Sequence, residues 1–266
     1  MLRQLRFDIY KILKSLIMWA VFALSLSLII ALPIKCYTEI YDFAEGHFKP
    51  GNGSTTAMGC MTGYEFYSYM ALCVIFFVAF FVGKDYTSGY YKNIGYAINK
   101  TYYVLSKVVW IALFAVLWFL LYFLMNIIVC VAMGGSVYYD PRDFFLGMSL
   151  RVLSAIAFGT VVMFLLFASK SMIVALVVPL IFLFTWGFAE DAIDRFIMQA
   201  FHLADLEKNR ILWRFSIMNY YGFYGGAGGY FSSRTDTATI YLTLLVYCAL
   251  AIGFSILICY MRKRKN

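Results

Sequence analysis

The residues of this chain that could do chemistry are concentrated in one polar stretch, from Gly83 to Lys107, between two long apolar runs. The stretch carries four lysines and a single acid, Asp85. Clustered ammonium groups with one carboxylate can make ion pairs, but they lack the paired nucleophile and base that covalent catalysis needs. We therefore expect a short helical elbow rather than an active site, with an ordinary basic loop as the alternative.

Catalytic and metal-binding patterns are not apparent in the rest of the sequence. The two histidines, His47 and His202, are far apart, and no CxxC pair accompanies them. The phosphate-binding pattern G-x-x-x-x-G-K-[ST] does not occur either. We expect this chain to be no enzyme and to bind no metal, nucleotide or other cofactor, so any ATP would be bound by another chain.

The elements that position the polar stretch are those of a membrane protein. The chain is 63% hydrophobic and 14% charged, and its mean hydropathy is +0.78. Soluble domains are near half apolar and about a quarter charged. The segment from Ser15 to Ile34 has no charged residue and is long enough to cross a bilayer as a helix. Backbone groups in lipid must be hydrogen-bonded internally, so the sequence predicts an all-α integral membrane protein.

Six apolar segments predict six membrane-spanning helices within a single domain, residues 1–266. An amphipathic helix from Met1 to Lys14 is expected to precede them on the membrane surface. Residues 190–236 are expected to form short interfacial or re-entrant helices, with one interfacial helix and a loop as the alternative. The expected spans are residues 15–33, 66–82, 108–133, 146–168, 172–188 and 238–261, and the expected elbow is residues 83–107.

Charge predicts the orientation. If both termini, the elbow and the turn at Lys170 share one side, that side holds 13 Lys and Arg residues but only two acids, Asp8 and Asp85. The positive-inside rule then places both termini in the cytoplasm, and the net charge of +8 reflects topology beside membrane lipids rather than nucleic-acid binding. Cys36 and Cys60 fall in a segment expected outside, where their spacing leaves a disulfide open.

A second group of candidates lies in the spans and the external segment. Arg151 is the one clear charge within an expected span, about five residues inside its outer end. Such a charge either reaches the headgroups or a structural partner, or lines a substrate path. Pro179 should kink the fifth span. Glycine-rich sequence around Tyr220, Tyr221 and Tyr224 predicts a mobile part of a pathway or gate.

The polar stretch resembles the signature of type-2 ABC exporter permeases. In that family an acid and, four positions later, a glycine precede a basic-rich helix, a small-polar-plus-arginine pair, and a lysine that opens the next span. This chain departs from the pattern with Asp85 for the usual glutamate, Tyr90 for a frequent threonine and Lys100 for arginine. The matching positions are Asp85, Gly89, Lys92, Asn93, Asn99, Lys100, Leu105, Ser106 and Lys107.

The layout of nearly the whole chain resembles this family. Within the family, the chain resembles the permeases of bacterial peptide and lantibiotic export systems or of antimicrobial-peptide immunity systems. It implies a dimer with a second copy or a similar permease, served by two ATPase subunits that bind ATP and magnesium. The substrate would be amphipathic: a peptide, a lipid-like molecule or a drug. It also implies an ATPase-coupling role for Asp85, Gly89, Lys92, Asn93, Lys100 and Lys107.

Two other functional classes compete with this expectation. A non-transport sensor or assembly protein could use the basic elbow to bind lipid or a regulator. A carrier driven by protons or sodium fits less well, because no Asp or Glu lies deep in an expected span. An ATPase partner would separate the exporter from both classes.

Overall fold

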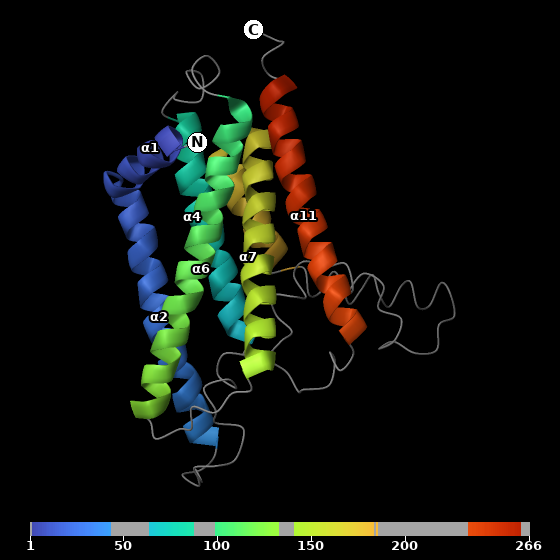
Figure 1. The fold of residues 1–266 in the computed structure, drawn as a ribbon. Coiled ribbons are helices and arrows are strands. Elements are labelled where there is room, and N and C mark those ends of the chain that lie inside the picture. The colour runs from blue at the N-terminus through green and yellow to red at the C-terminus, as the bar shows by residue number, and fades with distance from the viewer. Residues whose placement is uncertain are drawn as a thin grey trace.

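The structure is a computed structural model, and it describes residues 2–43, 64–87, 99–132, 141–183, 185 and 234–261. Every element in these ranges is a helix (Figure 1). The helices are α1 (Leu2–Leu13), α2 (Leu16–Phe43), α4 (Tyr64–Thr87), α6 (Lys100–Ala132), α7 (Pro141–Ser169), a shorter helix Met172–Leu183, and α11 (Arg234–Met261).

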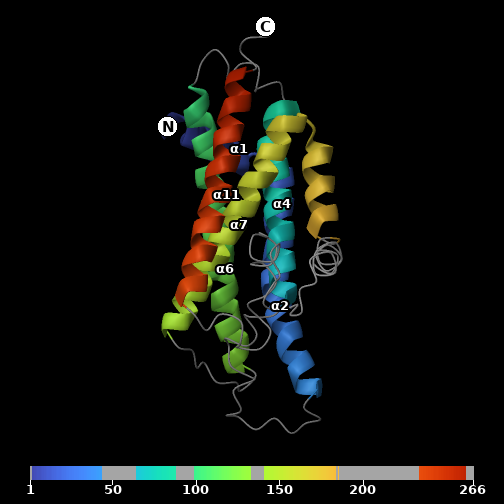
Figure 2. The ribbon, with the colours of Figure 1, turned by 90° about the vertical axis from the view of Figure 1, so that its right-hand side faces the viewer.

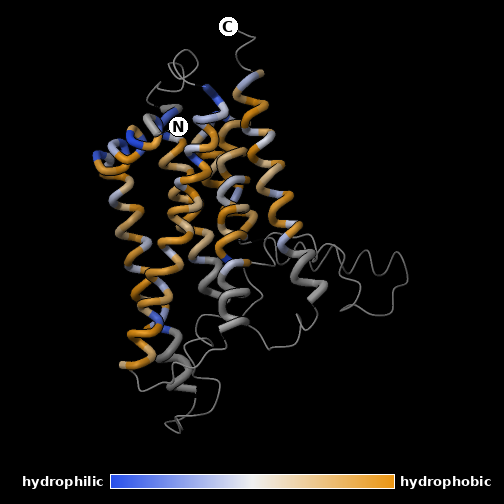
Figure 3. Tube along the Cα trace, viewed as in Figure 1, coloured by the Kyte–Doolittle hydropathy of each residue, from blue (hydrophilic) through white to orange (hydrophobic). Residues whose placement is uncertain are grey.

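Four of these helices are long and apolar enough to cross a membrane. Large apolar side chains also cover the outer faces of α2, α6 and α11, where Leu26, Leu121 and Leu257 are each about half exposed. Figure 3 shows the apolar character along the length of these helices. An outer surface of this kind is stable in lipid rather than in water, so the protein is membrane-embedded. The candidate spans are Leu16–Lys35, Lys100–Ala132, Ser149–Ser169 and Tyr241–Met261.

Helix α4 lies at the centre of the bundle. None of its described side chains, Tyr69 to Asp85, is exposed, and the helix packs against α2, α6 and α7. Gly159 lets α7 approach closely, because a Cβ there would lie 2.6 Å from Ile111 Cγ2 and 3.0 Å from Val74 Cγ1. Helix α7 in turn packs against α11, so α4 and α7 connect the two sides of the bundle.

One end of the bundle gathers segments that are far apart in sequence. Helix α1, the end of α4, the start of α6, the turn after α7 and the end of α11 all lie there (Figures 1 and 2). Helix α1 lies across this end (Figure 1). At Lys170 the backbone adopts a φ of 59°, which ends α7 and reverses the chain into the Met172–Leu183 helix.

Two helices continue beyond the expected spans. The first span was expected to stop at Pro33, and the candidate span in α2 is Leu16–Lys35, but the helix itself continues through Pro33 to Phe43. Leu32 and Pro33 are buried against the bundle, and these contacts hold the helix where the proline removes one backbone hydrogen bond. Helix α4 likewise continues past Val82 to Thr87.

The expected elbow is mostly the ends of two long helices. Its first five residues belong to α4, and its last eight, from Lys100, are the first two turns of α6. Several of its polar side chains are buried, among them Asp85, Ser106 and Lys107. Residues 88–98, in the middle of the elbow, lie outside the described residues.

The remaining helices differ from expectation mainly at their ends. Helix α7 begins at Pro141 rather than Leu146, since proline suits the first position of a helix. The fifth expected span is described as the helix Met172–Leu183, which contains Pro179 and is shorter than the other candidate spans. Helix α11 begins at Arg234. Residues 186–233, with most of the expected external segment, lie outside the described residues, as does Cys60.

Candidate functional site

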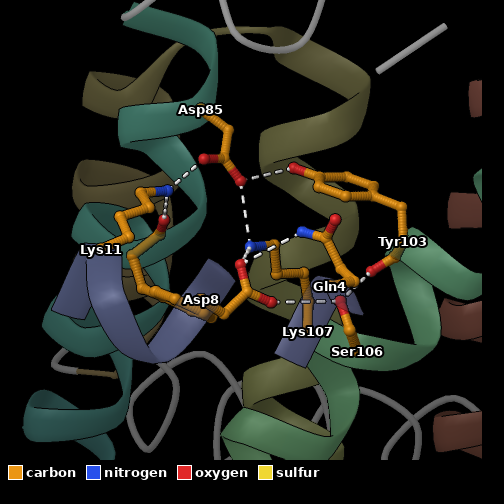
Figure 4. A network of polar contacts seen from close by, with 8 residues as sticks. Gln4, Asp8, Lys11, Asp85, Tyr103, Ser106 and Lys107 are labelled. Carbon is orange, nitrogen blue, oxygen red and sulfur yellow. Dashed lines mark hydrogen bonds and ion pairs between the residues drawn. The ribbon is translucent and has the colours of Figure 1, made fainter. Parts of the chain in front are cut away.

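Four charged side chains from three helices meet at the end of the bundle where α1 lies (Figure 4). Helix α1 contributes Asp8 and Lys11, α4 contributes Asp85, and α6 contributes Lys107. The side chains of Asp8 and Lys107 are 0% exposed, that of Asp85 is 1% and that of Lys11 is 10% exposed. Lys11 is therefore the member of this group that water can reach.

The four groups alternate in charge, in the order Lys11, Asp85, Lys107, Asp8, and we call them the ion chain. Lys107 Nζ lies 2.6 Å from Asp8 Oδ1 and 3.1 Å from Asp85 Oδ2. Lys11 Nζ donates to Asp85 Oδ1 and, at 2.7 Å, to the carbonyl oxygen of Phe81. With two cations and two anions the ion chain is neutral, which is what a site removed from water requires.

Neutral donors bind the carboxylate oxygens further. The Tyr103 hydroxyl donates to Asp85 Oδ2 at 2.8 Å. Ser106 Oγ donates to Asp8 Oδ2 at 3.3 Å, and Gln4 Nε2 donates to Asp8 Oδ1 at 3.2 Å. Each carboxylate thus accepts hydrogen bonds at both of its oxygens, so the buried anions are well satisfied.

Two aromatic rings contact the ammonium groups. Lys107 Nζ lies 4.2 Å from the ring centroid of Phe81 and 5.1 Å from that of Tyr103. Lys11 Nζ lies 5.3 Å from the Phe81 ring. All three distances fall within the range of cation–π attraction, so Phe81 stabilises both cations of the ion chain.

Helical spacing explains how the sequence assembles this site. In α1, Gln4, Asp8 and Lys11 are separated by four and three residues, which places them on one face of the helix. In α4, Asp85 lies one turn after Phe81. In α6, Lys107 lies one turn after Tyr103. The polar face of α1 therefore meets the last turn of α4 and the first turns of α6.

Burial shifts the pKa values of the groups that α1 contributes. Loss of water lowers the pKa of Lys11 to about 8, because it outweighs the attraction of Asp85. Burial also raises the pKa of Asp8, despite the nearby Lys107. Asp85, beyond the apolar part of α4, is buried too, but Lys107 and Lys11 outweigh that effect and lower its pKa. Burial in this site thus disfavours the charged forms of Lys11 and Asp8 relative to water.

A second polar cluster joins the start of α6 to the end of α11. Lys100 Nζ donates to the Cys259 carbonyl oxygen at 2.5 Å and lies 5.8 Å from the Tyr260 ring centroid. The Tyr260 hydroxyl donates to Asn99 Oδ1 at 3.1 Å, and the same oxygen accepts from the Thr101 backbone N–H at 3.0 Å. Asn99 is therefore the N-cap of α6 and a link to α11, while Lys100 satisfies a carbonyl at the C-terminal end of α11.

A third contact links α4 to the Met172–Leu183 helix. A Cβ at Gly83 would lie 3.1 Å from Met172 Cγ. Gly83 therefore permits α4 to approach the residue that begins the next helix. Together, the residues on the two sides of segment 88–98 contact α1, α11 and the Met172–Leu183 helix, as well as each other.

The structure brings together some of the site residues expected from the sequence. Asp85 and Lys107 meet in the ion chain, and Lys100 lies in the cluster with α11. Because Asp85 and Lys107 are buried within the chain, they are not placed to contact another protein directly in this structure. Gly89, Lys92 and Asn93 lie outside the described residues, as do Tyr220, Tyr221 and Tyr224.

Sequence reasoning missed Asp8 and Lys11, which are half of the ion chain. A signal was present, because Asp8 and Asp85 are the only two acids on the predicted basic side. Two rare acids among many cations are candidates for structural ion pairs, and both are in the ion chain. Their cation partners could not have been chosen, because 13 basic residues were available.

Arg151 lies deeper in its helix than expected. Because α7 begins at Pro141 rather than Leu146, more of the helix precedes Arg151. The residue is 5% exposed, so its side chain packs within the chain rather than reaching toward water. This burial argues against snorkelling, while a structural partner and a place along a substrate path both stay predictions. Pro179 is also buried, within the Met172–Leu183 helix.

The contacts described at these sites are ion pairs, hydrogen bonds and cation–π contacts. The described part of the chain contains no group of three or more His, Cys, Asp or Glu side chains placed to hold a metal ion. A scan against models of known protein families finds no match to this chain, and a search of curated proteins finds none either. Function is therefore inferred from the geometry and from the resemblance in the polar stretch.

Proposed function

We propose that this chain is the transmembrane subunit of an ATP-driven ABC exporter, and that segment 88–98 docks on a separate ATPase subunit. The observation that carries the proposal is the set of contacts on both sides of that segment. Asp85 joins α4 to α1 and α6, while Asn99 and Lys100 join α6 to α11. A force applied to segment 88–98 would therefore act on the ends of four helices.

Close packing supports such transmission. The contacts are buried ion pairs and hydrogen bonds, which have defined geometry and do not deform gradually. A displacement at the end of α4 would separate Asp85 from Lys107 unless α6 followed it. The two helices on either side of the segment would thus move together, and α1 and α11 would move with them.

The proposal divides the six coupling residues into two groups. Asp85, Lys100 and Lys107 are internal parts, since each is bound to another helix of this chain. Gly89, Lys92 and Asn93 are then the positions for contact with the ATPase. An acidic cleft on that partner would complement the lysine.

The assembly follows from the same proposal. Six spans with both termini in the cytoplasm, in a bacterial cytoplasmic membrane, would pair with a second copy or a similar permease to enclose a path. Two ATPase subunits would bind ATP and magnesium. The apolar and aromatic character of the helices suits an amphipathic substrate such as a peptide, a lipid-like molecule or a drug.

The test is co-purification with a candidate Walker-motif ATPase, to be sought among the coding regions next to this gene. We expect the wild-type chain and a Lys170→Glu control to retain the ATPase, because Lys170 is exposed at the same end but belongs to another turn. Gly89→Trp and Lys92→Glu should lose the ATPase or uncouple its hydrolysis from export. Asp85 is unsuitable as a docking variant, because its replacement would break the ion chain.

The opposite result has a clear meaning. If no ATPase binds, or if the Gly89 and Lys92 variants bind, hydrolyse ATP and export as the wild type does, the exporter proposal fails. A membrane sensor or assembly protein that binds lipid or a regulator would then be the better account.

A further inference from the structure

Helix α1 turns its polar face toward the protein. Gln4 and Asp8 are buried there, and Lys11 is nearly so. Among the described side chains of α1, Ile12 is the one apolar side chain that is buried. Hydrophobic burial against the bundle therefore contributes little to holding α1 in place.

The ion chain alone does not hold α1 against the bundle. Burial lowers the pKa of Lys11 and raises the pKa of Asp8, so the docked position disfavours the charged form of each. Buried ion pairs of this kind fix geometry more than they stabilise it. Another contact is needed to hold α1 against α4 and α6.

The outward face of α1 is apolar along one side. Phe7, Ile9, Tyr10 and Leu13 are between 39% and 58% exposed. Helix α1 lies across the end of the bundle (Figures 1 and 3), directly before the apolar segment that begins at Leu16. A helix in this position lies at headgroup level, with its apolar side toward the acyl chains.

The outward charge of α1 is purely positive. Arg6 in α1 and Lys14, directly after its last residue, are exposed, and Lys14 Nζ lies 5.0 Å from the Tyr10 ring centroid. Asp8, the only acid in α1, is turned inward to Lys107. By burying this acid, the ion chain leaves a surface that complements anionic headgroups.

We propose that anionic phospholipid binds the outward face of α1, through Arg6, Lys14 and the exposed apolar side chains, and that this binding keeps the ion chain closed. The membrane would then act through α1 on α4 and α6, the two helices that flank segment 88–98. The inference needs only a membrane-embedded chain, so it does not rest on the transport proposal.

The test uses the full-length chain in nanodiscs of phosphatidylcholine, with or without about a third phosphatidylglycerol. Hydrogen exchange of α1 amides reports docking, and acylation of Lys11 by a water-soluble amine reagent reports closure of the ion chain. Phosphatidylglycerol should slow both about tenfold, given two basic side chains near the headgroups and partial screening by salt.

Two variants make the result specific. Arg6→Gln with Lys14→Gln should remove the response to phosphatidylglycerol. Lys170→Asn should keep it, because Lys170 is a basic residue at the same end but not on α1, and asparagine tolerates its φ of 59°. Unchanged exchange in α4 and α7 shows that each variant is folded.

Three outcomes would overturn the proposal. The wild type could show the same exchange and labelling in both lipids, or the Arg6 and Lys14 variant could respond as the wild type does. Protection of α1 could also arise only after a protein partner is added, which would make this face a protein interface. None of these readouts needs an ATPase, so failure here is distinct from failure of the exporter proposal.

Discussion

Lys107 Nζ lies 2.6 Å from Asp8 Oδ1 although the two residues are 99 positions apart in the chain. This pair joins the N-terminal helix to α6, and both side chains are completely buried. Lys107 also contacts Asp85, so it is the single cation between two buried anions. The stability of this end of the bundle should therefore depend strongly on Lys107.

Replacing Lys107 by methionine should be severely destabilising. The variant would leave Asp8 and Asp85 buried without the cation between them, and breaking a buried pair in this way costs about 3–5 kcal/mol. Denaturant unfolding in detergent measures the loss. A double variant, Asp8→Asn with Lys107→Met, should recover part of it by removing one of the stranded charges. Wild-type stability of the single variant would contradict the role given to Lys107.

Stability should rise with pH above about 8 because of Lys11. Its pKa falls from 10.5 in the unfolded chain to about 8 in the structure, so the folded form holds fewer protons between these values. The free energy of unfolding should then increase by about 1 kcal/mol per pH unit in this window. Thermal unfolding measured between pH 7.5 and 9.5, within the window that the two pKa values of Lys11 define, tests this prediction.

Lys11→Arg provides the control for that pH dependence. Its guanidinium stays protonated throughout the window, so the rise should be absent. Lys14→Arg, at an exposed position directly after α1, should keep the wild-type rise. A rise of equal size in Lys11→Arg would mean that another group is responsible.

Gly159→Ala should destabilise the packing of α7 against α6 and α4. The new Cβ would lie 2.6 Å from Ile111 Cγ2, and the branched side chain has little freedom to move away. Overpacking of this kind costs about 1–3 kcal/mol. Gly253→Ala in α11 is the matched control, since apart from its chain neighbours and its own helix backbone nothing lies within 4 Å of an added Cβ. That control should be neutral or stabilising by about 0.5–1 kcal/mol, and equal losses in both variants would refute the packing argument.

Lys100→Met should loosen the end of α11 without unfolding the bundle. The variant loses the hydrogen bond to the Cys259 carbonyl and the favourable charge at the helix C-terminus, each worth about 1 kcal/mol. Hydrogen exchange should accelerate in the last turn of α11 and stay unchanged in α4. Uniform acceleration, or none, would show that Lys100 does not hold the two helices together.

The sequence allowed the class of fold to be predicted, because long uncharged segments in lipid have one stable solution. It also allowed the amphipathic helix α1 to be predicted, from apolar residues such as Leu5, Ile9 and Ile12 at helical spacing. Helix ends were less predictable, because polar residues such as Asp85 and Lys107 mark the end of a helix only when they are solvated. Their burial depends on partners in other helices, which no local pattern contains.

The ion chain illustrates this limit. Asp8 was visible as a rare acid, but its partner Lys107 is distant in sequence, and nothing distinguishes that lysine from its neighbours in composition. The pairing depends on how α1 crosses the ends of α4 and α6. The coupling role that the resemblance implies for these positions stays a prediction, and the resemblance did not indicate that Asp85 is buried.

The length of helix α6 determines how deep Lys107 lies relative to the bilayer. Its 33 residues extend about 50 Å, whereas a bilayer's hydrocarbon layer is about 30 Å thick. If the excess is shared between the two ends, about 10 Å projects at each, and Lys107, seven residues after Lys100, lies at the boundary of the hydrocarbon. The ion chain would then lie at the interface between the hydrocarbon layer and the headgroups, where polarity changes most steeply with depth. Hydrophobic mismatch becomes a physical variable for this site, because a thicker bilayer would draw Lys107 inward and a thinner one would expose it.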